Sequence, residues 1–248
     1  MTTSPTTLSS AWDGLSEHLI ASFYPVERQG GSRFWQPVDG APTVRAPLTE
    51  CTLDMSLNWQ SPFENAGTST MPTLQAMLAS GAFEPWVKDN GKGFISTFEG
   101  RTGITKLNSQ QIFSGMPPIK FQVTALFRAW KDPVSEVTEP IDQLMLWVLP
   151  QSLADDGPIL SALENLAKGE ITEAMLPSVA PTKIAMKYKQ RLYMPLVIES
   201  VNLPLGSPVN KDGHHVEMPV TMTICSLAAI DSNDWGRVDA VVGTGFKA

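Results

Sequence analysis

The chain contains three histidines that could serve as a general base near neutral pH. They are His18, His214 and His215. Nucleophilic catalysis would also need a serine in a suitable turn, but neither Ser80 nor Ser114 stands in a GxSxG context. The histidine pair directly follows Asp212-Gly213, and adjacent side chains of an extended strand point to opposite faces. We therefore interpret His214 and His215 as exposed turn residues and not as metal ligands.

The acidic residues gather in two short clusters, Asp155-Asp156 and Asp231 to Asp234. Both stand where helix caps and loops commonly use aspartate, so we interpret them as structural. Two carboxylates at the right separation could also hydrolyse a glycosidic bond. The sequence therefore leaves a cell-wall hydrolase open as an alternative function.

The cysteine and glycine patterns favour no cofactor or metal site. Cys51 and Cys225 are far apart and in no CxxC spacing, so we predict small buried side chains and neither a disulfide nor a zinc site. Gly91-Lys92-Gly93 lacks the spacing of a phosphate-binding loop and is typical of a hairpin turn. The sequence predicts no catalytic, cofactor-binding or metal-binding residue, and we expect a protein that is not an enzyme.

A row of cations stands near the C-terminal third of the chain, at Lys183, Lys187, Lys189 and Arg191. Such a row could contact phosphates or an acidic partner, but we interpret it as a charged strand face that protects a sheet edge. Pro219 cannot donate to a strand ladder, which predicts that its strand lies at a sheet margin or bulge.

Seven tryptophans are the other side chains that could recognise a ligand. They include Trp35, Trp59, Trp86, Trp130, Trp147 and Trp235. Exposed indole rings in one row would suit a carbohydrate-binding β-sandwich, which is a second alternative function. We interpret them as core and interface anchors.

Period-two hydrophobicity is the strongest structural signal, and it predicts the strands that must carry these groups. One run has Ile184, Met186 and Tyr188 on one face, and another runs from Val216 to Ile224. The segment between them contains Pro204, Gly206, Pro208 and Asp212-Gly213, which predicts an antiparallel pair with a long loop. Further strands are predicted at 53–59, 94–98 and 121–129.

Helical spacing is confined to a few segments. Residues 139–150 predict a helix with Pro140 at its start, although a buried strand over 144–149 is a competing interpretation. A second helix is predicted over 158–169 and a short one over 74–81. The fold class is therefore mainly β (α+β), an antiparallel β-sandwich or barrel with one or two flanking helices.

The N-terminal segment predicts an amphipathic helix, because Leu8, Trp12, Leu15, Leu19 and Phe23 recur at steps of three or four. A flexible Gly30-Gly31 break follows. We therefore expect residues 1–30 to form a helical arm that reaches a neighbour, with packing on its own domain as the alternative. Residues 31–248 are expected to form the β domain, with helical insertions around 139–169.

The composition of the chain limits the classes of partner that we expect. The 248 residues carry 18 Lys and Arg against 25 Asp and Glu, a net charge of -7, so tight binding of nucleic acid through phosphate neutralisation is not expected by default. There is no run of about 20 apolar residues and no signal-peptide pattern at the start. We expect a protein without membrane insertion, made in a cytoplasm.

Three segments resemble the tube-proximal baseplate proteins of contractile-tailed bacteriophages, which initiate or extend the tail tube. The segments are Thr105 to Gly115 with Pro117-Pro118; Ala129-Trp130-Lys131-Asp132-Pro133 with Glu136-Val137 and Pro140 to Pro150; and Arg191 to Ile230 with the turn Asn210-Lys211-Asp212-Gly213. The resemblance covers roughly residues 50 to 232.

The resemblance implies a tail-tube-like β domain that self-associates in a ring of three or six copies around the DNA channel. It also implies a virion location, contacts with other baseplate, tube or sheath proteins, and DNA that passes without sequence-specific binding. The N-terminal segment and the loop 204–213 are then the expected ring-contact elements.

Overall fold

The computed structural model describes residues 6–28, 34–60, 110–153 and 178–238, and the chain divides into two compact units. The first comprises residues 1–55 and 117–248, and the second comprises residues 56–116. The strands of the first unit are β1 (Thr7–Ser9), β2 (Ile20–Arg28), β3 (Trp35–Pro37), β4 (Thr43–Asp54), β7 (Lys120–Arg128), β8 (Ile184–Tyr188), β9 (Arg191–Asn202) and β10 (Glu217–Ser226). Its helical segments are η1 (Glu17–Leu19), η2 (Val134–Thr138), α4 (Glu139–Val148) and α7 (Ser232–Gly236).

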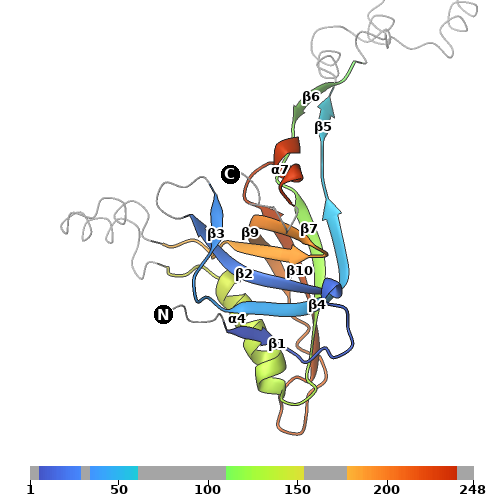
Figure 1. The fold of residues 1–248 in the computed structure, drawn as a ribbon, viewed down its shortest axis with the longest axis vertical. Coiled ribbons are helices and arrows are strands. Elements are labelled where there is room, and N and C mark those ends of the chain that lie inside the picture. The colour runs from blue at the N-terminus through green and yellow to red at the C-terminus, as the bar shows by residue number, and fades with distance from the viewer. Residues whose placement is uncertain (1–5, 29–33, 61–109, 154–177, 239–248) are drawn as a thin grey trace, which may run out of the picture. The chain divides into compact units, whose positions relative to one another are not determined.

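Six strands of the first unit form a closed antiparallel circuit (Figure 1). Going round it, β4 pairs with β7, β7 with β10, β10 with β9, β9 with β8, β8 with β2, and β2 with β4 again. The long strand β4 makes closure possible, because residues 44–47 pair with β2 and residues 48–54 pair with β7. Closing a sheet removes the free edges that would otherwise seek another chain. The predicted mainly β fold is confirmed.

Alternating side chains fill the interior of this circuit. On β7 the inward residues Phe121, Val123, Ala125 and Phe127 are buried, and they face the buried methionine, valine and isoleucine side chains of β10. Burying a side chain of this size contributes about 1.5–3 kcal/mol. The period-two pattern that predicted β7, β8 and β10 therefore identified the core-facing positions correctly.

The N-terminal helix was a wrong prediction. Residues 20–28 form β2, which pairs with β4 and β8 and places Phe23 in the fully buried core. Pro25 in this segment removes a helical hydrogen bond, and the run of Ile20, Phe23, Tyr24 and Val26 has high β propensity. Far from being a separate arm, this segment closes the strand circuit.

Two other expectations about strands need correction. The period-two runs at 184–188 and 216–224 are not paired with each other, because β9 lies between them, and the long-looped pair is β9 with β10. Strand β10 is not at a sheet margin, since β7 and β9 flank it. Pro219 is tolerated because the β9 pairing begins only at Thr221, which leaves the proline nitrogen beyond the ladder.

Helix α4 confirms the helix predicted from residue 139 and excludes the competing strand. Its buried face contains Pro140, Ile141, Leu144 and Trp147. This face packs against β1, β4 and β9 (Figure 1). The elements predicted at 74–81, 94–98 and 158–169 lie outside the described residues.

In the second unit, the described residues form a short two-stranded antiparallel sheet, which we name the β5–β6 hairpin although residues 61–111 separate its strands. Strand β5 (Asn58–Gln60) pairs with β6 (Ile112–Gly115). The single strand predicted over 53–59 is therefore two strands, because β4 ends at Asp54 and β5 begins at Asn58.

Candidate interaction surfaces

The β5–β6 hairpin exposes an unusual amount of apolar surface. Leu57, Trp59, Ile112 and Phe113 are each about half exposed. The rings of Trp59 and Phe113 contact each other at 5.4 Å between centroids, and the Ser114 hydroxyl donates to the Asn58 carbonyl at 3.0 Å. These contacts hold the hairpin together. Clustered exposed aromatic and aliphatic side chains mark protein interaction sites, and we define these four residues as the apolar hairpin surface.

A separate apolar hollow lies on the first unit. Its apolar lining comprises Trp12, Leu15, Pro47, Leu126 and Trp130. The Trp12 and Trp130 rings meet edge to face at 6.3 Å, and the Trp130 side chain is 56% exposed. The guanidinium of Arg128 lies 4.9 Å from the centre of the Trp130 ring. Aromatic anchors of this kind dominate the binding energy of protein interfaces.

A buried carboxylate fixes the geometry of this apolar hollow. Glu136 is 8% exposed, and its carboxylate accepts backbone hydrogen bonds from Trp130 and, at 3.0 Å, from Lys131. The Ser10 hydroxyl donates to the Glu136 carbonyl at 3.1 Å, which ties the N-terminal segment to the same turn. Glu136 thus bonds the backbone of Trp130 directly and ties to the same turn the segment that precedes Trp12.

The same hydrogen bonds keep Glu136 ionised. Burial raises the pKa of its carboxyl, but backbone N–H donors from Lys131, Trp130, Ala11 and Asp132 together outweigh burial and lower the pKa. Asp132 acts beside it as a cap, with carboxylate oxygens accepting from the Val134 and Ser135 backbone. The segment Trp130-Lys131-Asp132-Pro133 with Glu136, part of the family resemblance, is therefore a tightly hydrogen-bonded turn.

The prediction of two exposed turn histidines is confirmed only in part, because His214 is exposed and His215 is not. The Asn210 side-chain oxygen accepts from the backbones of Asp212 and His214, at 2.9 and 3.0 Å, and His214 is exposed. His215 is half-buried and forms an isolated bridge with Val209. The loop around this turn also exposes Leu205 at 76% and Val209 at 53%.

The acidic cluster at 231–234 is structural, as predicted. Asp231 and Asp234 form a reciprocal capping box at the start of α7, with Asp234 N donating to Asp231 at 2.7 Å and Asp231 N donating to Asp234 at 3.2 Å. The cluster at 155–156 lies outside the described residues. Within the described ranges, no group of three or more His, Cys, Asp or Glu side chains could hold a metal ion.

The cysteine prediction was wrong in detail, because Cys51 is exposed and Cys225 is half-buried. Cys51 pairs with Val123 of β7 and belongs to the end of β4, residues 49–54, in which every residue is exposed. Both thiols are free.

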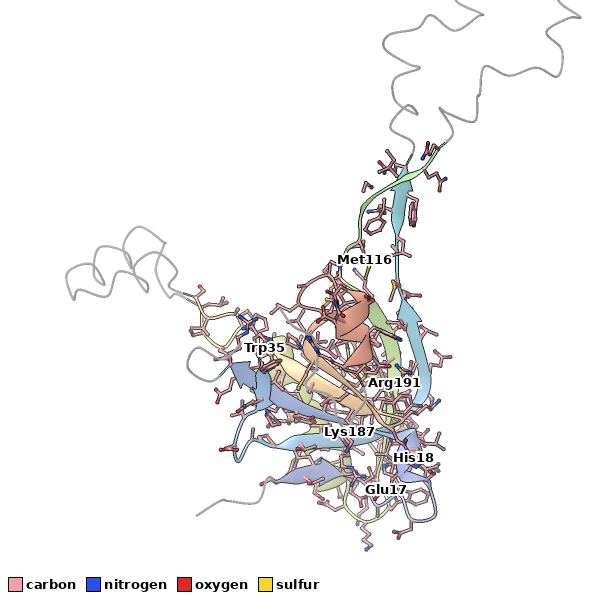
Figure 2. All side chains as sticks on the ribbon, turned by 45° about the horizontal axis from the view of Figure 1, so that its top comes forward. Glu17, His18, Trp35, Met116, Lys187 and Arg191 are labelled. Atoms are coloured by element: carbon pink, nitrogen blue, oxygen red, sulfur yellow. The ribbon has the colours of Figure 1, made fainter. Side chains whose placement is uncertain are left out.

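The cationic row contradicts its predicted role. Lys187 is on β8, which pairs with β2 on one side and β9 on the other, so the row does not protect a sheet edge. Lys187 and Lys189 line one hollow together with Arg45, and Lys189 and Arg191 line another with Trp235. Figure 2 labels Lys187 and Arg191 together with Glu17 and His18.

Sequence reasoning did not identify the apolar hollow. Trp12 is predicted in a helix, Trp130 is predicted as a core or interface anchor, and Glu136 enters only through the family resemblance. One local signal could have indicated the turn beside the hollow. Asp132-Pro133 followed by Glu136 is typical of a capped helix start.

Among the described residues, no helix is both long and apolar enough to cross a membrane. No protein-family model matches this sequence, and no curated protein matches it.

Proposed function

We propose that this chain is a structural subunit of the baseplate of a contractile phage tail, and that copies of it form a ring around the DNA channel. In this role it is a virion component that connects tail tube, hub or sheath-initiating proteins. The mainly β fold is compatible with a tail-tube-like domain, and the sequence resemblance supports the family.

The observation that carries the proposal is the presence of two different apolar surfaces on one chain. The apolar hairpin surface projects aromatic side chains, and the apolar hollow is a concave site lined by two tryptophans. A ring requires head-to-tail contacts, in which each subunit supplies both halves of the interface. We propose that the hairpin of one copy packs into the hollow of the next.

The two alternative functions have less support. A glycosidase needs a cleft with two carboxylates, but each described hollow contains at most one acidic side chain: Glu17, Glu50 or Asp13. A carbohydrate platform needs free indole faces. Arg128 lies over the Trp130 ring and Arg191 lies over the Trp235 ring, at 4.9 and 5.3 Å.

Native mass spectrometry of the purified chain, alone and with a tail tube protein, tests the proposal. One variant removes the hairpin anchors (Trp59→Ser with Phe113→Ser), and a second removes a hollow anchor (Trp130→Ser). Each should weaken ring formation by about 30-fold or more, because an interface anchor contributes roughly 2 kcal/mol. Leu146→Ser on α4 is the matched control, since Leu146 is 64% exposed but outside both surfaces.

A mixing experiment separates this head-to-tail contact from other contacts. The hairpin variant retains an intact hollow, and the hollow variant retains an intact hairpin, so equal mixing should give heterodimers that cannot grow into rings. Rings from either variant alone, or equal loss in the Leu146→Ser control, would refute the proposed interface.

A further inference from the structure

The turn between β8 and β9 has an unusual backbone that presents cationic side chains. It contains two residues, Lys189 with φ 48° and Gln190 with φ 62°. Hairpin turns with two positive φ angles normally use Asn-Gly, because side-chain-bearing residues are strained in this conformation. Strained residues that persist in a fold are candidates for a functional role of their side chains.

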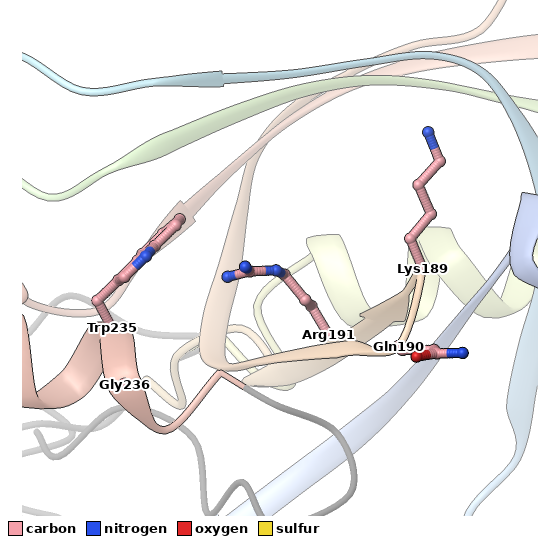
Figure 3. Close-up of a pocket in the computed structure, with 5 residues that line it drawn as sticks. All are labelled: Lys189, Gln190, Arg191, Trp235 and Gly236. Atoms are coloured by element: carbon pink, nitrogen blue, oxygen red, sulfur yellow. The ribbon is translucent and has the colours of Figure 1, made fainter.

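This turn separates two adjacent hollows, both lined by Lys189 and Gln190. Arg45 and Lys187 line one, and Arg191 lines the other beside Trp235 (Figure 3). We define Arg45, Lys187, Lys189 and Arg191 as the cationic surface. The strand register supports this grouping, since Ser22 pairs with Arg45 on one side and with Lys187 on the other.

Little negative charge opposes these cations. Within the described residues, the carboxylate that lines either hollow is Glu17, which lies 3.8 Å from Arg45 and has a side chain that is 85% exposed. Other strands pair their cations closely, with Lys120 at 2.7 Å from Glu199 and Arg128 at 3.2 Å from Glu217. In a chain of net charge -7, four cations close together with a single exposed carboxylate beside them require an explanation.

Two cations of this surface also contact aromatic rings. The Lys189 ammonium lies 5.0 Å from the centre of the Tyr188 ring, and the Arg191 guanidinium lies 5.3 Å from the centre of the Trp235 ring. Figure 3 shows Arg191 directed toward Trp235, while Lys189 extends away from the turn. Cation–π contacts position a charge without neutralising it.

We infer that the cationic surface binds the phosphodiester backbone of a nucleic acid without reading its base sequence. Its cations are spread over β4, β8, β9 and the turn, which suits a multivalent anion better than a single small one. Cations interleaved with aromatic faces and with the Ser22 hydroxyl and Gln190 amide are the groups that contact nucleic-acid backbones and bases. This inference does not depend on ring formation, because it concerns one subunit.

Binding is tested by fluorescence anisotropy of the purified full chain with a short labelled DNA duplex at increasing salt. If Lys187, Lys189 and Arg191 each neutralise a phosphate while Arg45 stays with Glu17, affinity falls roughly 40-fold between about 50 and 200 mM salt. Lys187→Gln with Lys189→Gln should leave one such contact and reduce that fall to roughly 3-fold. Lys131→Gln with Lys211→Gln removes the same charge from exposed positions outside the cationic surface and should leave the salt dependence unchanged.

Two further measurements complete the test. Circular dichroism establishes that both double variants are folded. Competition with polyglutamate tests whether the surface binds an acidic polypeptide as well as it binds the duplex. Absence of duplex binding at low salt, an equal loss in the Lys131 and Lys211 control, or displacement by polyglutamate at equal charge concentration would each overturn the inference. Failure here would leave the ring proposal intact, because native mass measures that proposal independently.

Discussion

Glu136 shows how one buried side chain organises the backbone beside the apolar hollow. Its carboxylate satisfies backbone donors at Trp130 and Lys131, while its carbonyl accepts from Ser10. An ionised group accepting several backbone N–H bonds is stabilised despite burial. The apolar hollow therefore depends on a residue that does not line it.

Glu136→Gln should destabilise the first unit by roughly 1.5–3 kcal/mol at neutral pH, because hydrogen bonds to a charged acceptor are lost. The folded pKa of Glu136 lies below its ordinary value of 4.5. Its stabilising contribution is therefore complete above about pH 4.5 and is lost as the pH falls through the folded pKa. The difference in the free energy of unfolding between wild type and variant should therefore become smaller in acid.

Urea denaturation across this pH range measures the effect, with Glu50→Gln at an exposed glutamate as the control. If the difference in the free energy of unfolding between wild type and Glu136→Gln stays constant down to the acid transition, this role for the carboxylate is contradicted.

At the scale of elements, the β8–β9 turn contains removable strain. Replacing Lys189 by Asn and Gln190 by Gly should raise the free energy of unfolding by about 0.5–1 kcal/mol, since Asn-Gly suits this turn type. Thermal denaturation measures this change in stability. The control is Asp212→Asn, which gives the exposed pair Asp212-Gly213 the same Asn-Gly sequence and should have little effect. A loss of stability in the β8–β9 variant would show that the turn is not strained.

Strand β2 provides the second element-scale prediction. Phe23→Ala should cost about 3–5 kcal/mol, because Phe23 is fully buried between β4 and β8. Leu19→Ala is the control, since Leu19 precedes the strand and is 41% exposed. Equal, small losses in both variants would instead favour a separable N-terminal arm.

Sequence periodicity predicted the elements with the cleanest patterns. Alternation identified β7, β8 and β10, and Pro140 marked the start of α4. It failed at the N-terminus, because Leu8, Trp12, Leu15, Leu19 and Phe23 also satisfy helical spacing, and only tertiary pairing with β4 and β8 decides for a strand. The apolar hollow could not be predicted, since residues far apart in sequence, from Trp12 to Trp130, form it.

At the scale of the whole molecule, strand closure would complement the self-association that we propose. The closed circuit satisfies the backbone hydrogen bonds of its six strands internally, so strand addition is not required for a stable subunit. In the proposed ring, contacts between copies would instead be made by side chains in the apolar hairpin surface and the apolar hollow. A subunit of this kind can fold before it assembles, with ring stability arising from repeated modest interfaces.

The most direct test is cryo-electron microscopy of a contractile-tailed particle that contains this chain. The account predicts a closed ring of copies around the DNA channel, with the β5–β6 hairpin of each copy against the Trp12 and Trp130 hollow of its neighbour. A chain that occurs as single copies away from the tail axis, or a ring whose copies meet through other surfaces, would contradict it.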